Sequence, residues 1–272
     1  MKPQPLVAPG NDYRSLRSVT DGPVPSVAVL IPVYNRGPLL ANVLAGLSRQ
    51  TFAHPFEVVV IDDGSEEDIG AVTEPYSSDL ALTLLRQDRD GFGLARARNL
   101  GVSSVDADVV VFLDADCIPG HEWLSHHIAW HRKASNLVVT GSRRHIDAFL
   151  DANMISRGSV DLHDMAGQPE TATGRFDTDD WRGLVYRRSQ RLLLGDAGVR
   201  AALGGNSSMR RETFLDAGGA STDFRAWGGE DTELAWRLWN AGAFVVPEDE
   251  AIIYHQNYGD AVGASERRAT AR

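Results

Sequence analysis

Short apolar runs recur along the first 140 residues, and each one ends in a polar or glycine-containing loop. The runs cover residues 27–31, 57–61, 80–85, 109–113 and 137–140. Because they are short and bounded by loop-forming residues, they predict strands buried within a sheet. Stretches with helical spacing separate several of the runs, and the first such stretch has an apolar face made of Leu39, Leu40, Val43, Leu44 and Leu47. This alternation predicts an α/β fold with a doubly wound, mostly parallel sheet flanked by helices.

The pattern weakens after residue 142 and returns near residue 204. A run of small residues precedes a predicted short helix at 211–217, and a second helix at 230–241 is followed by Gly242 and by apolar runs at 244–247 and 251–255. The first 25 residues contain five prolines and no periodic pattern, which predicts an extended or disordered arm. We divide the chain, as one domain, into an arm at 1–25, a first half at 26–142, a variable segment at 143–205, a second half at 206–258 and a tail at 259–272.

Polar residues directly follow three of the predicted strands. These are Tyr34-Asn35, Asp62-Asp63 and Asp114-Ala115-Asp116. Because ligands bind at the carboxyl ends of parallel strands, all three groups are expected to converge on one crevice. The alternative is that each is only a turn or a helix cap.

The two carboxylates of Asp114 and Asp116 stand one residue apart at the end of a strongly apolar run. They repel each other, and burial without a partner is costly, so a positive group is expected beside them. A divalent cation is the simplest candidate, because carboxylate oxygens suit Mg²⁺ or Mn²⁺ and such ions also bind phosphate-bearing substrates.

The loop and helix around residues 88–98 contain glycines and arginines. The segment Gly91-Phe92-Gly93-Leu94-Ala95-Arg96 is not a dinucleotide-binding fingerprint, because Arg96 stands in place of the third glycine. Arg89, Arg96 and Arg98 remain as counter-charges for phosphate, although an arginine on a helix is more often simply solvated.

A histidine-rich helix is predicted at 119–132. His127 and His131 have the i, i+4 spacing of a metal site, but no third ligand is nearby in the sequence. A water-exposed helix face is therefore the favoured interpretation of these two residues.

The stretch Trp227-Gly228-Gly229-Glu230-Asp231 opens the predicted helix at 230–241. Acidic residues at a helix amino terminus interact favourably with the helix dipole, which is the simpler explanation for Glu230 and Asp231. The two glycines allow a close backbone approach to a ligand, and tryptophan offers a flat apolar surface suited to a sugar ring. Further on, His255 stands at the end of the last apolar run.

Composition excludes several classes of protein. The 272 residues are 43% hydrophobic, enough for one large or two small domains, and the net charge of −10 argues against non-specific nucleic-acid binding. No apolar run is long enough for a transmembrane segment, and the amino terminus has no signal-peptide pattern, so we expect a soluble, cytoplasmic protein. The single cysteine, Cys117, excludes an internal disulfide and a cysteine-based zinc site.

Taken together, five motifs resemble those of nucleotide-sugar-dependent glycosyltransferases of the GT-A fold, family 2. They are Ile31-Pro32-Val33-Tyr34-Asn35, Val60-Ile61-Asp62-Asp63-Gly64-Ser65, Ala97-Arg98-Asn99, Phe112-Leu113-Asp114-Ala115-Asp116 and Trp227-Gly228-Gly229-Glu230-Asp231. The carboxyl-terminal segment is similar to the galactosyltransferase and polypeptide N-acetylgalactosaminyltransferase groups. The resemblance covers residues 27–255 and is weakest between 142 and 203.

The resemblance implies a UDP-sugar donor, a Mn²⁺ or Mg²⁺ cofactor and transfer of a hexosyl or N-acetylhexosaminyl group. It places the nucleotide sugar in the first half, the catalytic groups in the second half, and an acceptor surface or lid in residues 143–205. Asp62 is expected to bind the uracil edge, Asp114, Asp116 and His255 to hold the metal, and Asp231 to act as the base beside Glu230. The implied nucleotide-sugar site comprises Pro32, Val33, Tyr34, Asn35, Arg36, Asp62, Asp63, Gly91, Gly93, Arg98, Asp114, Ala115, Asp116, Trp227 and Gly229.

Several alternatives remain open at this point. An acidic residue at position 231 favours an inverting transferase over a retaining one, because the retaining relatives typically lack it. A catalytically silent sugar-nucleotide-binding module has the same motifs. A nucleotidyltransferase is disfavoured, because the loop after the first strand has only Arg36 and one glycine. A carbohydrate, a peptide and a small natural product all remain possible acceptors.

Overall fold

The computed structural model describes residues 11–166, 185–186, 188–194 and 203–257. In this part of the chain eight strands form one sheet, in the order β3-β2-β1-β4-β7-β6-β8-β5. The strands are β1 (Val27–Val33), β2 (Glu57–Asp62), β3 (Ala81–Arg86), β4 (Val109–Leu113), β5 (Cys117–Pro119), β6 (Leu137–Ile146), β7 (Asn206–Arg210) and β8 (Phe244–Gln256). The helices are η1 (Tyr13–Ser18), α1 (Gly37–Leu47), α2 (Ile69–Thr73), η2 (Glu74–Tyr76), α3 (Leu94–Ser104), α4 (Trp123–His131), α5 (Ala152–Ser156), α6 (Leu162–Met165), α8 (Arg211–Asp216) and α9 (Glu230–Asn240).

The sheet has a parallel half and a mixed half. Strands β3, β2, β1 and β4 are parallel neighbours, as the alternating pattern predicts. Strand β7 is antiparallel to both β4 and β6, whereas β6 and β8 are parallel and β5 is antiparallel to β8. The expected mostly parallel arrangement therefore describes the first half, and the second half is mixed.

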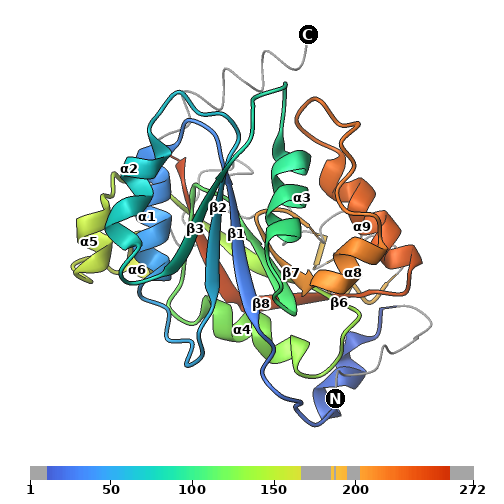
Figure 1. Ribbon diagram of the computed structural model, residues 1–272. Coiled ribbons are helices and arrows are strands. Elements are labelled where there is room, and N and C mark those ends of the chain that lie inside the picture. The colour runs from blue at the N-terminus through green and yellow to red at the C-terminus, as the bar shows by residue number, and fades with distance from the viewer. Residues whose placement is uncertain (1–10, 167–184, 187, 195–202, 258–272) are drawn as a thin grey trace.

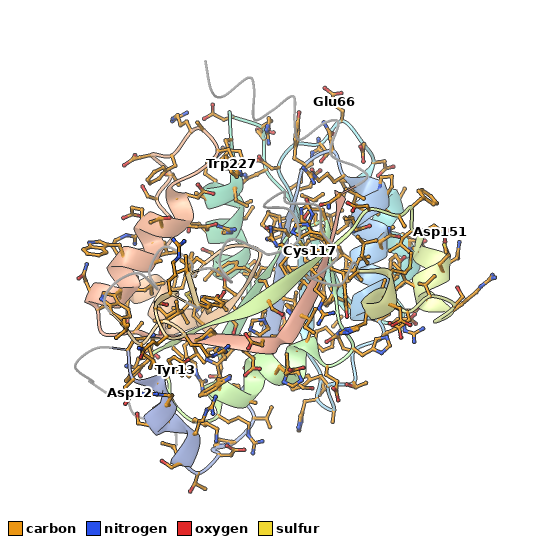
Figure 2. All side chains as sticks on the ribbon, turned by 180° about the vertical axis from the view of Figure 1, so that it is seen from behind. Asp12, Tyr13, Glu66, Cys117, Asp151 and Trp227 are labelled. Carbon is orange, nitrogen blue, oxygen red and sulfur yellow. The ribbon has the colours of Figure 1, made fainter. Side chains whose placement is uncertain are left out.

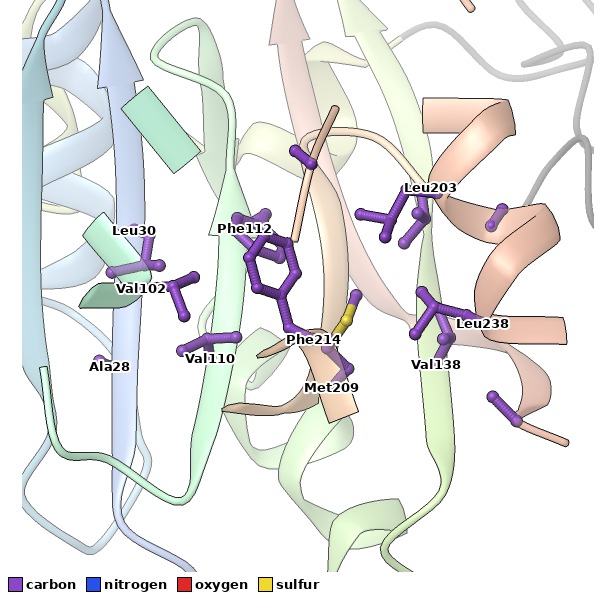
Figure 3. Packing of buried hydrophobic residues seen from close by; sticks show 14 of the residues in the cluster. Ala28, Leu30, Val102, Val110, Phe112, Val138, Leu203, Met209, Phe214 and Leu238 are labelled. Carbon is purple, nitrogen blue, oxygen red and sulfur yellow. The ribbon is translucent and has the colours of Figure 1, made fainter. Parts of the chain in front are cut away.

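Helices cover both faces of the sheet (Figure 1). On one face, α3, α8 and α9 pack against the sheet, and Figure 3 shows Phe112, Met209, Phe214 and Leu238 of this core. On the other face, Leu40, Val43, Leu44 and Leu47 of α1 pack with residues of α4 on the same strands. The apolar face predicted for the first helix is thus the face that is buried.

The predicted strands at 244–247 and 251–255 are one strand, β8, of 13 residues. Its partner β6 extends to Ile146, beyond the predicted end at residue 140, with an irregularity between Gly141 and Ser142. At Gly141 an added Cβ would lie 2.1 Å from the carbonyl oxygen of Ala251, so this crossing requires glycine. The extended pair brings His145 opposite His255 in register.

The amino-terminal segment differs from the predicted extended arm. Within its described part, η1 buries Tyr13 and Leu16 to 2% and 1% exposure, and the Tyr13 ring meets the Trp130 ring edge-on with centroids 6.1 Å apart. The amide of Asn11 donates to the Val245 carbonyl at 2.7 Å and accepts from the Val245 N–H at 2.8 Å. The prediction of an extended or disordered arm is wrong for these residues. A few contacts with residues distant in the sequence hold the segment in place, and a local periodic pattern does not reveal such contacts.

The interpretation of His127 and His131 as an exposed helix face is also wrong. Both side chains are fully buried and point at β7. His127 Nε2 lies 3.0 Å from Asn206 Oδ1, and both histidines bind the Ser208 hydroxyl, at 3.0 and 2.8 Å. The polar residues of α4 and the polar residues of β7 therefore satisfy each other inside the molecule.

None of the helices in the described ranges combines the length and the apolar character needed to cross a membrane. Residues 167–184 and 195–202 of the variable segment, and the tail at 259–272, lie outside the described residues.

Candidate active site

A cleft of about 570 Å³ lies at the carboxyl ends of β1 and β4. It is lined by Pro32, Val33, Tyr34, Arg36, Asp63, Arg89, Gly91, Phe92, Gly93, Leu94, Ala97, Asp114, Ala115, Asp116, Arg225 and Trp227. Each of the three groups of polar residues that follow a predicted strand contributes to it. They meet because β2, β1 and β4 are adjacent in the sheet and run in the same direction.

One end of the cleft combines a carboxylate with a stacked aromatic ring. The Arg89 guanidinium lies 3.6 Å from the centroid of the Tyr34 ring and binds Asp63 at 2.5 Å. Gln87 Nε2 donates to Asp63 at 2.6 Å. An added Cβ at Gly93 would lie 2.0 Å from Asp63 Oδ1, so only glycine permits this approach. The carboxylate is therefore held in a fixed position at the cleft wall.

Asp62 does not line the cleft. Its carboxylate accepts from the Ser65 backbone N–H at 2.8 Å and forms an ion pair with Arg86. Asn35 is likewise engaged in the loop, since its Oδ1 accepts from the Glu66 N–H at 2.8 Å. Asp62 and Asn35 thus brace the loops after β1 and β2, and the neighbouring Asp63 and Tyr34 line the cleft.

All three residues of the Asp114-Ala115-Asp116 turn line the cleft. Asp116 forms an ion pair with Arg36, and its Oδ2 lies 3.6 Å from His255 Nε2. Burial opposes ionisation of Asp116, but the nearby His255 and Arg36 side chains hold its pKa below the ordinary value. Burial raises the pKa of Asp114, and the charge of Asp116 raises it further. Asp116 therefore loses its proton at a lower pH than Asp114 does.

The donors at this turn fit a divalent cation. Ligand atoms of Asp116, Cys117 and His255 all lie within 4.8 Å of one another. Burial raises the pKa of the Cys117 thiol well above its ordinary value, so Cys117 is a poor ligand. Figure 2 shows Cys117 near the middle of the molecule. A carboxylate oxygen of Asp116 and an imidazole nitrogen of His255 are donors suited to Mn²⁺ or Mg²⁺, whereas Asp114 is not part of this group.

The amino terminus of α9 is connected to this turn through Arg98. Arg98 is 4% exposed and forms an ion pair with Asp231. Burial opposes the charge of Arg98, but Asp231 and then Asp114 outweigh it and raise the pKa of Arg98. One guanidinium therefore lies within the electrostatic reach of both carboxylates, so Asp231 and Asp114 belong to one charged cluster.

The loop before Asp231 contributes Trp227 to the lining of the cleft. Gly228 and Gly229 have φ values of 101° and 98°, in the left-handed region that favours glycine. Glu230 is 4% exposed and accepts from the Gly228 N–H at 3.1 Å, which stabilises this turn. Trp227 is 62% exposed and lies in the upper part of the view in Figure 2.

Several residues that line the cleft or contact its carboxylates do not belong to the five sequence motifs. Gln87 and Arg89 directly follow β3, so the same strand-end argument that singled out Asp62 and Asp63 also applies to them. Arg143 Nη2 lies 3.7 Å from Asp114 Oδ2, but Arg143 belongs to the extension of β6, where no apolar pattern marks a strand. Arg225 lines the cleft from the loop before Trp227, and no sequence signal distinguishes it.

Residues 28–215 match the family model described as glycosyl transferase family 2. The chain belongs to this family. Residues 196–254 of this family 2 chain also match the model described as the N-terminal domain of galactosyltransferase.

Among curated proteins, the family 2 chain is 31% identical over 239 residues to a chondroitin synthase of Pasteurella multocida (strain Pm70), covering 85% of the chain and 24% of that protein. It is 32% identical over 228 residues to a validoxylamine A glucosyltransferase of Streptomyces hygroscopicus subsp. jinggangensis (strain 5008), covering 79% and 51%. It is 28% identical over 230 residues to polypeptide N-acetylgalactosaminyltransferase 6 of Bos taurus, covering 81% and 35%. The chain therefore spans between a quarter and about half of the length of these relatives.

Solved structures with the same architecture confirm the GT-A fold. The mannosyltransferase PcManGT from Pyrobaculum calidifontis, in complex with GDP-Man and Mn²⁺, aligns with a TM-score of 0.62 and 20% identity, over 89% of this chain and 63% of that one. GalNAc-T7 with UDP, GalNAc and Mn²⁺ aligns with a TM-score of 0.64 and 20% identity, over 86% and 43%.

Proposed function

We propose that this chain is an inverting glycosyltransferase that moves a sugar from a UDP-sugar to an acceptor hydroxyl with the help of a divalent cation. One observation carries the proposal: the carboxylates at the end of β4, His255 at the end of β8 and Asp231 at the start of α9 form one connected cluster. Arg98 makes the connection, through its ion pair with Asp231 and its electrostatic interaction with Asp114.

The donor nucleoside is assigned to the Tyr34 end of the cleft. We assign the uracil edge to Asp63 instead of Asp62, because Asp63 lines the cleft and Asp62 is engaged within its own loop. A carboxylate accepts from the imide N–H of uracil, and the Tyr34 ring with its stacked Arg89 offers a flat surface beside it.

The diphosphate is assigned to the turn that contains Asp114 and Asp116. These two carboxylates and His255 would hold the cation, and the ion when bound offsets the negative charge that develops on the departing diphosphate. Arg36 fixes the orientation of Asp116, and Arg143 places a further positive charge beside Asp114. The Mn²⁺ present in the two solved neighbours supports the use of a divalent cation.

Asp231 is assigned as the general base. Arg98 holds its Oδ1, and its side chain is 29% exposed, so an incoming hydroxyl can reach it. A carboxylate on the side opposite the phosphate accepts the hydroxyl proton as the new bond forms, and attack from that side inverts the anomeric centre. Glu230 stabilises the glycine turn that follows Trp227, and we assign Trp227 to stacking on a sugar ring.

Donor hydrolysis tests this proposal, because water can take the place of an unidentified acceptor. A panel of UDP-sugars is incubated with the protein, with and without MnCl₂, and UDP release is measured. Asp231→Asn is expected to keep Mn²⁺-dependent UDP binding and to lose about 10²- to 10⁴-fold in rate. Asp116→Ala is expected to lose the Mn²⁺-dependent part of UDP binding.

Three outcomes contradict the proposal in different ways. An Asp231→Asn protein that releases UDP at the wild-type rate excludes Asp231 as the base. A product sugar that keeps the donor's anomeric configuration, observed by NMR directly after mixing, indicates a retaining transferase. Tight Mn²⁺-dependent UDP binding without turnover of any donor or acceptor indicates a silent binding module.

A further inference from the structure

Behind His255, on the side away from Asp116, four polar side chains form a chain of hydrogen bonds. His255 Nδ1 lies 2.8 Å from Asn257 Oδ1, and His145 Nδ1 lies 3.1 Å from the same oxygen. Asn257 Nδ2 donates to Asp147 Oδ1 at 2.7 Å. The two imidazole rings meet with their centroids 5.2 Å apart, across the pairing of β6 with β8.

The hydrogen bonds in this chain have fixed directions. A carboxylate only accepts, so the Asn257 amide must turn its nitrogen toward Asp147 and its oxygen toward the imidazoles. The opposite orientation would bring two acceptor oxygens within 2.7 Å of each other. An amide oxygen also only accepts, so His145 and His255 must each carry a hydrogen on Nδ1.

This constraint determines which nitrogen of His255 faces the carboxylates. In a neutral imidazole with hydrogen on Nδ1, the lone pair is on Nε2. Nε2 is the atom that lies 3.6 Å from Asp116 Oδ2, at the turn that fits a divalent cation. With hydrogen on Nε2 instead, the same ring would direct an N–H toward Asp116 and have no lone pair there for a metal.

We infer that Asn257, oriented by Asp147, is a positioning residue that fixes the tautomer and the ring orientation of His255 for metal coordination. This inference rests on the proposed function for the identity of the metal ligands. Neither Asn257 nor Asp147 belongs to a motif that the sequence singles out. The same amide oxygen also binds His145, so Asn257 sets the tautomer of both imidazoles.

The first test needs no metal and no substrate. Protein labelled with ¹⁵N in histidine is studied by NMR without divalent cations, above the ordinary pKa of histidine. His255 and His145, assigned through His255→Ala and His145→Ala, are expected to show the Nδ1–H tautomer. Asn257→Ala is expected to shift both residues toward the Nε2–H form, and Asn153→Ala, a control on the exposed side of α5, to change neither.

The second test measures the affinity for Mn²⁺ by calorimetric titration with MnCl₂, with and without UDP. Outer-shell partners of metal-bound histidines typically contribute about 10- to 100-fold to metal affinity, and Asn257→Ala is expected to weaken binding by that factor. Asp147→Ala, which releases the amide but leaves it in place, is expected to weaken binding less. It also provides a second variant if Asn257→Ala unfolds, which thermal melting of each protein shows.

The outcomes separate this inference from the proposed function. Mn²⁺ binding and tautomers that stay at wild-type values in both variants, while His255→Ala loses the metal, overturn the inference and leave the proposed function standing. Wild-type protein that shows the Nδ1–H tautomer but binds no Mn²⁺ supports the assigned role of Asn257 in fixing the ring and contradicts the metal site of the proposed function.

Discussion

Two adjacent aspartates at the end of β2 have different surroundings, and these surroundings give them different roles. Asp62 is 2% exposed and bridges the Ser65 N–H of its own loop and Arg86 at the end of β3. Asp63 is 4% exposed but lines the cleft, where Gln87 and Arg89 hold it. A substitution of Asp62 can therefore serve as the control for the same substitution of Asp63.

We expect Asp63→Asn to weaken UDP binding by about 10- to 100-fold, since a hydrogen bond to a charged group contributes about 1.5–3 kcal/mol. Both variants should lose about 1–3 kcal/mol of unfolding free energy, because each carboxylate is buried and binds an arginine. Asp62→Asn should have the smaller effect on UDP affinity. Urea unfolding and UDP titration of both variants measure this. Equal loss of UDP affinity in the two variants would contradict the assignment of the uracil edge to Asp63.

The sequence predicts that acidic residues gather at the end of β2, but it does not tell which of the two faces the ligand. The direction of each side chain depends on the turn that follows, where the Ser65 N–H binds Asp62. It also depends on Gly93, which comes from a loop about thirty residues away and leaves room only for the Asp63 carboxylate. Neither contact has a local sequence signal.

At the scale of elements, β7 and α4 form a buried polar layer. Asn206 Nδ2 donates to the carbonyls of Ser142 and Ala251, so its Oδ1 accepts from Trp123 Nε1 at 2.7 Å and from His127 Nε2. His127 Nδ1 then accepts from the Ser208 hydroxyl, which in turn accepts from His131 Nε2. A prediction from hydrophobic periodicity fails for both elements, because it assigns polar residues to the solvent-exposed face. Here the polar residues are buried and form hydrogen bonds with each other.

Burial lowers the pKa of His127 to about 4 and lowers that of His131 well below its ordinary value. Both side chains are therefore neutral in the folded protein, whereas in the unfolded chain they take up protons below about pH 6.5. The unfolded state then binds more protons than the folded state as the pH falls from about 6.5 to 4. Stability is fully present above this window and decreases within it.

For His127 alone, the loss of stability across that window is expected to be about 3 kcal/mol. Urea unfolding of the wild type and of His127→Gln at a series of pH values measures it, because the variant lacks this titration while the carboxylates remain common to both. The variant should be less stable at neutral pH and should have a shallower pH dependence. Parallel pH profiles for the two proteins would exclude a buried neutral His127.

At the scale of the whole molecule, the two halves of the sheet differ in how far the sequence predicts them. In the parallel half, β1, β2 and β3 pair in chain order through crossover helices, and β4 then pairs with β1 on its other side. In the mixed half β6 pairs with β8 about a hundred residues further on, and β5 and β7 join without an apolar run that marks them. Motif residues of both halves nevertheless meet at one cleft, where Trp227 from the loop before α9 lies with residues that follow β1, β2 and β4.

Strand β8 links two distant parts of the protein. Near its end it carries His255, and near its start Val245 is bound by Asn11 through both its N–H and its carbonyl. The Asn11 amide also donates to the Leu192 carbonyl at 3.0 Å. One side chain thus joins segments that are 181 and 234 residues away from it.

Asn11→Ala is expected to cost about 1–3 kcal/mol of unfolding free energy, because buried backbone groups of Val245 and Leu192 lose their partner. Asp12→Ala removes an exposed ion pair with Arg14, where both side chains are 59% exposed, and is expected to change stability by less than about 0.5 kcal/mol. Urea unfolding of both variants measures the difference, and Mn²⁺-dependent UDP binding measures whether it reaches the cleft. Because the start and end of β8 contact different cores, Asn11→Ala should lower stability while UDP affinity stays near the wild-type value. Equal stability of the two variants would mean that the amino-terminal segment is not a structural part of the domain.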